Sequence, residues 1–105
     1  MRLEELRKEI DAIDAELLRL INRRAKVALS VGATKNRSGL PLYDPARERD
    51  VLARACRANE GPLCDGAVSK IFRLIIEESR RLEATVAGCE VTAASRPSEK
   101  VRELT

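Results

Sequence analysis

The sequence predicts an all-α protein, and two observations point to this class. Apolar residues make up 44% of the 105 residues but aromatic residues only 2%, so Leu, Ile, Val and Ala must form the core. Such a composition is typical of helices. Apolar residues also recur at steps of three and four over long stretches, which is the period of an amphipathic helix. The length suits one domain, and we expect three helices in it.

The first helix is expected from about residue 2 to about residue 37. Gly32 is tolerated inside it, and the turn-forming sequence SGLP at 38–41 ends it. Its apolar residues form a heptad seam on one face: Leu3, Leu6, Ile10, Ile13, Leu17, Leu20, Val27 and Val31.

This helix is too long for the rest of the chain to cover. It would be roughly 50 Å long at ~1.5 Å per residue. A compact domain of this size has a radius of gyration of only about 13 Å. The apolar seam would stay exposed in a single chain, and a second copy is the simplest cover. We therefore expect a homodimer.

The second helix is expected from about Pro45 to Ala58, because Asp44 can cap its free N–H groups and Pro45 suits its first position. The sequence NEGP at 59–62 forms the next break. The third helix is expected from near Asp65 to about Ala87. The stripe along its inward face comprises Val68, Ile71, Phe72, Ile75, Ser79, Leu82 and Val86.

We expect residues 1–88 to form the domain and residues 89–105 to form a polar, mobile tail. This tail contains Pro97 and lacks an apolar stripe, and we expect a short helical piece at its end.

The composition argues against several chemistries. The chain has no His, which removes imidazole catalysis and His-ligated metal sites. Cys56, Cys64 and Cys89 lack metal-type spacing, and we interpret them as reduced thiols of a cytoplasmic protein. The charged N-terminus is unlike a secretory signal, and no apolar run is long enough to span a membrane. We expect no metal and no cofactor. The net charge of +3 permits attraction to small anions without requiring nucleic acid.

Two cations lie on the seam face of the first helix. Arg24 occupies a seam position where an apolar residue is expected, and Lys35 follows eleven residues later. This spacing is three turns with about 20° of rotation, so the two share a face roughly 16 Å apart along the axis. Together they could hold two ends of one small anion. The alternatives are a register-setting or snorkelling arginine and a lysine that favours the helix C-terminus.

The first turn of the second helix contains Arg47, although a helix N-terminus favours anions. Arg47 and Glu48 lie one turn before Val51 and Leu52, so we expect both on the inward face, whereas Arg49 faces solvent. The alternative interpretation is an intrahelical or interhelical ion pair.

Ser79 and Glu83 lie four residues apart on the inward face of the third helix. A carboxylate there needs a cationic partner or a proton, whereas Ser79 could simply bond back to a carbonyl. Arg7 is about 25 Å from Arg24 along the axis, so it could reach the same small site only from a second chain. The inward polar residues are rich in cations and include no obvious nucleophile. They predict a pocket for a small polyanion that acts by electrostatic fit.

Three motifs together resemble the all-helical class of chorismate mutase. They are LRKEIDAIDAELLRLINRRAKVALSVGATK in the first helix, GLPLYDPARERDVL at the second helix start and IFRLIIEESRRLE in the third helix. The resemblance covers residues 3–87. It implies an intertwined homodimer of three-helix chains, in which each active site borrows one residue from the partner. We expect a monofunctional enzyme, since these 105 residues hold no dehydratase, dehydrogenase or aldol-type synthase domain.

The resemblance also implies roles for the substrate-binding residues. Arg24 and an Arg7 donated across the dimer would hold the two substrate carboxylates, one of them with help from Ser79. Glu48 and the main chain around Asp44 would bind the ring hydroxyl. Arg47 would help to order the polar network of the pocket.

The implied reaction is the Claisen rearrangement of chorismate to prephenate, on the route to phenylalanine and tyrosine. It is unimolecular, so it needs no nucleophile, general base or cofactor. Lys35 and Glu83 would be catalytic by donating to the ether oxygen, where negative charge develops. An ionised carboxylate cannot donate a hydrogen bond, so we expect Glu83 to act in its protonated form.

Three other functions compete with this interpretation. An isochorismate-pyruvate lyase shares the fold, although the full residue set, Glu48 included, favours the mutase. A non-catalytic regulatory module of a shikimate-pathway enzyme could use residues 88–105 to contact its partner. Nucleic-acid binding is disfavoured because the chain lacks aromatic stacking platforms and a basic block.

Overall fold

The structure is a computed structural model, and it describes residues 2–88. It contains the helices α1 (Leu3–Ser38), α2 (Pro45–Ala58) and α3 (Asp65–Gly88). These bounds confirm the three helices predicted from the sequence to within one or two residues. The predicted polar tail at 89–105 lies outside the described residues.

Local signals in the sequence account for the helix ends. The Asp44 side chain caps α2, because its Oδ1 accepts a hydrogen bond from the Arg47 N–H at 3.0 Å. Gly39 ends α1 in the left-handed conformation, with φ of 71°. The Leu40 N–H then reaches the Lys35 carbonyl at 2.9 Å, which satisfies one of the last carbonyls of the helix.

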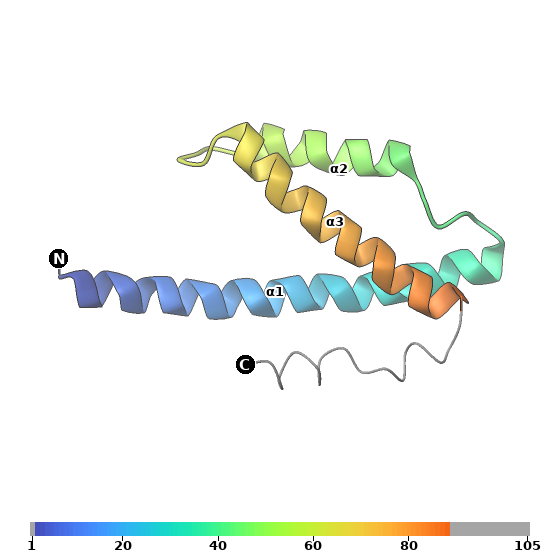
Figure 1. The fold of residues 1–105 in the computed structure, drawn as a ribbon, viewed down its shortest axis with the longest axis horizontal. Helices are drawn as coiled ribbons and strands as arrows, with labels where there is room; N and C mark the ends of the chain where they lie inside the picture. The colour runs from blue at the N-terminus through green and yellow to red at the C-terminus, as the bar shows by residue number, and fades with distance from the viewer. Residues whose placement is uncertain (1, 89–105) are drawn as a thin grey trace.

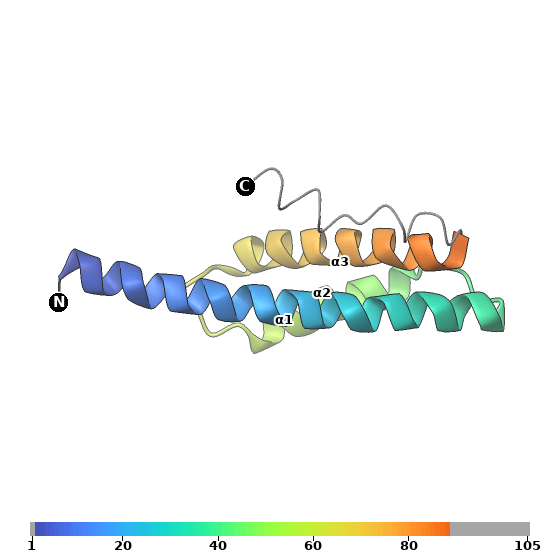
Figure 2. The same cartoon turned by 90° about the horizontal axis from the view of Figure 1, so that it is seen from below.

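The three helices form a flat, open arrangement in which α3 packs against both of the others. Figure 1 shows α3 crossing diagonally from α2 to the C-terminal half of α1, and Figure 2 shows the thin edge of the molecule. The extents are 54 × 36 × 16 Å and the radius of gyration is 16.6 Å. That radius exceeds the value of about 13 Å for a compact domain of this length.

The packed interior of this chain is small. Its buried apolar residues are Ala28 on α1 with Val68 and Ile76 on α3, and among residues 2–88 no side chain is fully buried. The apolar face predicted for α3 coincides only in part with the face that packs against the other helices. Ile71 is 47% exposed, whereas Ile76, which the predicted stripe omits, is buried. The reason is that α3 contacts helices on two sides, so its buried surface is not one stripe.

The apolar seam of α1 is exposed along its length, as the length of the helix predicts. Its exposed residues include Leu3, Leu6, Ile10, Ile13, Leu17, Leu20, Val27 and Val31. Contiguous apolar surface of this kind marks an interaction site rather than ordinary surface variation. None of the described helices combines the length and the apolarity needed to cross a membrane.

Gly32 allows α1 and α3 to approach closely. A Cβ atom at this position would lie 2.7 Å from both the Cα atom and the carbonyl oxygen of Glu83. These are backbone atoms, which cannot rotate away as a flexible side chain could. The glycine that the sequence tolerates inside α1 is therefore required by the helix crossing.

We predict that Gly32→Ala lowers the free energy of unfolding by about 1–3 kcal/mol, because the added methyl group forces the two helices apart. The matched control is Gly66→Ala in α3, where the new Cβ would have only an ordinary contact of 3.9 Å with Cys64 Sγ. That control should be neutral or stabilising, since Ala favours helix. Urea denaturation of both variants at one protein concentration measures the difference, and equal stabilities would contradict the close-contact explanation.

Candidate active site

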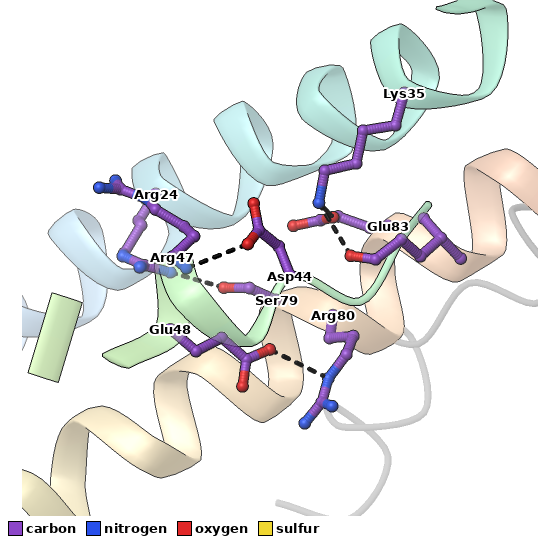
Figure 3. Close-up of polar contacts among 9 residues, drawn as sticks. Arg24, Lys35, Asp44, Arg47, Glu48, Ser79, Arg80 and Glu83 are labelled. Atoms are coloured by element: carbon purple, nitrogen blue, oxygen red, sulfur yellow. Dashed lines mark hydrogen bonds and ion pairs between the residues drawn. The ribbon is translucent and has the colours of Figure 1, made fainter. Parts of the chain in front are cut away.

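A cavity of about 290 Å³ opens between α1, α3 and the start of α2. Every candidate residue from the sequence except Arg7 lines it, and all of the lining candidates are labelled in Figure 3. The apolar part of the wall is Val27, Ala28, Val31, Leu42, Val51 and Ile76. The polar part is Arg24, Lys35, Asp44, Arg47, Glu48, Ser79, Arg80 and Glu83.

Lys35 and Glu83 form an ion pair across the α1–α3 crossing. Lys35 Nζ donates to Glu83 Oε1 at 2.9 Å and to the Leu42 carbonyl oxygen at 2.9 Å. The two side chains are only 19% and 13% exposed. The pair lies beside Gly32, so the close approach of the helices brings the ammonium and the carboxyl together. An ammonium group has a further N–H with which it can bind a ligand.

Arg24 and Ser79 form a second link between the same two helices. Arg24 Nη1 donates to Ser79 Oγ at 2.6 Å in a partly buried position. This contact accounts for a cation on the apolar seam, and it turns the Ser79 hydroxyl toward the cavity rather than back along its own helix. Because Ser79 is neutral, the charge of Arg24 is available to attract an anion.

The start of α2 places Asp44, Arg47 and Glu48 on the remaining side of the cavity. The Arg47 guanidinium lies at its rim, because it pairs with Asp50 at 3.2 Å and its side chain is 59% exposed. The intrahelical ion pair considered from the sequence is thus present for Arg47. Glu48 is more enclosed and makes an interhelical pair, with Arg80 Nε at 3.5 Å from its Oε2.

Arg80 is a cavity residue that the sequence analysis missed. Its guanidinium carbon lies 5.0 Å from the centroid of the Tyr43 ring, in addition to its contact with Glu48. The signal that could have found it is helical spacing: Arg80 lies four residues after Ile76, which is buried. The predicted stripe does not include Ile76, and therefore it does not place Arg80, one turn further along, on the inward face.

The charges of the cavity suit a small ligand with more than one negative group. Its wall carries the cations Arg24, Lys35, Arg47 and Arg80 and the acids Asp44, Glu48 and Glu83. Within residues 2–88 no group of three or more Cys, Asp or Glu side chains is placed to hold a metal ion. The arrangement can bind and orient an anion by hydrogen bonds and charge, and it can stabilise negative charge that develops near Lys35.

Arg7 does not line this cavity and is exposed near the N-terminal end of α1. It lies about 25 Å along the helix axis from Arg24 at the normal rise per residue. Figure 1 shows this end of α1 projecting away from the crossing with α3. The single chain therefore does not bring Arg7 together with the other candidate residues.

Comparison with known proteins gives a consistent result. The family model described as "Chorismate mutase type II" matches residues 6–84. A bifunctional chorismate mutase/prephenate dehydratase from Aquifex aeolicus is 42% identical over an alignment of 88 positions, which covers 80% of this chain and 24% of the relative. This chain thus spans about a quarter of the length of the first bifunctional relatives that it matches.

Two solved structures resemble the fold over most of both chains. The chorismate mutase of Thermus thermophilus (form II) has a TM-score of 0.77 at 38% identity, covering 79% of this chain and 94% of its own. The chorismate mutase of Helicobacter pylori, solved in complex with prephenate, has a TM-score of 0.73 at 31% identity. The match covers 80% of this chain and 91% of that one.

Proposed function

This chain belongs to the chorismate mutase type II family, and we propose that it catalyses the rearrangement of chorismate to prephenate. The observation that carries the proposal is the pairing of Lys35 with Glu83 beside Arg24 in one cavity. Chorismate has two carboxylates, a ring hydroxyl and the ether oxygen whose C–O bond breaks. The cavity offers a suitable group for each of these except one carboxylate, which needs a residue from a second chain.

Binding is assigned to the groups that match the substrate's fixed charges. Arg24, with the Ser79 hydroxyl beside it, holds one carboxylate. Glu48 accepts from the ring hydroxyl near the main chain of Asp44, and Arg47 orders the rim. Holding both ends of the substrate favours the folded conformation in which the new C–C bond can form. This converts part of the binding free energy into a lower barrier.

Catalysis is assigned to Lys35 and Glu83. Negative charge develops on the ether oxygen as the C–O bond breaks. A hydrogen bond to that oxygen is therefore stronger in the transition state than in the ground state. Lys35 Nζ and Glu83 Oε1 are 2.9 Å apart, so one oxygen atom can contact both groups. In the structure Glu83 accepts from Lys35. To donate to the ether oxygen beside the ammonium it must carry a proton in the complex with substrate, because an ionised carboxylate cannot donate and would repel the developing charge.

The active site is completed by a second copy of the chain. The exposed seam of α1 is the surface that the copy covers, and Arg7 on that helix contributes the other carboxylate-binding group. An intertwined dimer gives Arg7 a route to the partner's cavity that its own chain does not offer. The proposal involves neither nucleic acid nor a membrane surface.

The isolated protein should convert chorismate to prephenate without added cofactor, and Lys35→Met should lower kcat by about 10²–10³ through loss of a transition-state donor. Lys26→Met, on the exposed face of the same helix, is the matched control and should retain activity. Chorismate loss and prephenate appearance are followed separately. Failure to form prephenate would leave a regulatory role, and preference for isochorismate would favour the lyase.

Glu83→Gln should retain activity, because an amide N–H donates to the ether oxygen as a protonated carboxyl group would, whereas an ionised carboxylate cannot donate. The measurement is kcat for the wild type and the variant at saturating chorismate. A large loss of kcat in the variant would contradict the role of Glu83 as a hydrogen-bond donor.

Two inactive variants should restore activity to each other when their subunits are mixed. Arg7→Met and Arg24→Met damage opposite halves of a shared site, so each heterodimer keeps one intact site and an equal mixture recovers about one quarter of wild-type activity. Mixing Arg24→Met with Lys35→Met is the control, because both changes lie in the same half. Recovery in neither mixture, or sedimentation as a folded monomer, would contradict the shared site.

A further inference from the structure

Arg80 contacts two residues near the start of α2, one on each side of its N-cap. Its side chain extends from α3 to Glu48 in the first turn of α2 (Figure 3). Its guanidinium also lies over the ring of Tyr43, in the loop just before that helix. Asp44, the N-cap of α2, lies between these two contacts in the sequence. One guanidinium therefore links the residues on both sides of the α2 N-cap to α3.

This contact differs from the surface ion pairs of the same helices. The Arg80 and Glu48 side chains are 36% and 25% exposed, whereas those of the neighbouring Arg81–Glu78 pair are 75% and 62% exposed. Exposed pairs contribute little because water screens them, and partial shielding strengthens the attraction. A planar guanidinium can also pair with a carboxylate while it lies over an aromatic ring, which an ammonium does less well.

The start of α2 needs such an anchor. In the described part of the chain α3 packs against both other helices, whereas α1 and α2 are joined through α3 and the intervening loop. The carboxylate of Glu48 has two oxygens, and Arg80 engages Oε2. The other oxygen is then held ready to accept from a ligand without further ordering, which lowers the entropic cost of binding.

We propose that Arg80 is a positioning residue that fixes the Glu48 carboxylate and the Tyr43–Asp44 turn at the mouth of the cavity. By holding Glu48, Arg80 would help the cavity to recognise the ring hydroxyl of the substrate. This effect on substrate binding rests on the proposed mutase function. Arg80 itself does not touch the reacting atoms. Its loss therefore affects substrate binding more than the chemical step.

The test compares Arg80→Met with Arg81→Met, an adjacent arginine with an exposed partner. Arg80→Met should raise KM for chorismate about 10-fold with a smaller change in kcat, and Arg81→Met should change neither. Arg80→Lys should recover part of the loss, because it keeps the charge but not the planar contact. In a Glu48→Gln background, Arg80→Met should add little further loss. Equal effects of the two arginine variants, or full additivity with Glu48→Gln, would overturn the proposal.

Hydrogen exchange provides a readout that does not depend on activity. Amides of residues 43–48 should exchange faster in Arg80→Met than in wild type, with no such change in Arg81→Met. Unchanged exchange in this segment would overturn the positioning role. If wild type forms no prephenate but the exchange difference appears, the proposed function fails while the role of Arg80 stands.

Discussion

The close approach of α1 and α3 at Gly32 is the constraint on which the rest of the site depends. Because the helix backbones nearly touch there, Lys35 meets Glu83 on one side of the contact, and Arg24 can reach Ser79 on the same pair of helices. The positions of both cations relative to α3 are thus set by main-chain packing. Long side chains without such packing would keep their charged ends mobile, and ordering them when a ligand binds would cost conformational entropy.

This design suits a reaction that needs positioning and electrostatics rather than a reactive side chain. The cavity holds charged groups in contact with one another before any ligand arrives, so little reorganisation is needed when charge develops. Each cation has a protein partner, whether a carboxylate, a hydroxyl or a carbonyl oxygen. These partners keep the side chains oriented and leave other N–H groups for the substrate.

The features that follow from local chemistry could be predicted from the sequence. The bounds of α2 are an example, since Asp44 and Pro45 are strong start signals in themselves. Placement of Arg24, Lys35, Ser79 and Glu83 on inward faces follows from helical periodicity, and these residues do line one cavity. Features that depend on how two helices meet could not be predicted in this way. Gly32 looked merely tolerated because its purpose is a contact with Glu83, far along the chain. Ile76 and Arg80 were missed because α3 packs on two sides, which a single stripe does not describe.

The dimer that we propose from the long exposed seam of α1 would link the folding of this protein to its concentration. Because few apolar residues are buried within residues 2–88, one chain by itself gains little hydrophobic stabilisation, and the proposed dimer would bury the exposed seam between its two copies. In the proposed dimer, folding and assembly would behave as one bimolecular equilibrium, and the proportion of native protein would rise with its concentration. A cell that makes too little of this chain would lose more activity than the shortfall in copy number alone suggests.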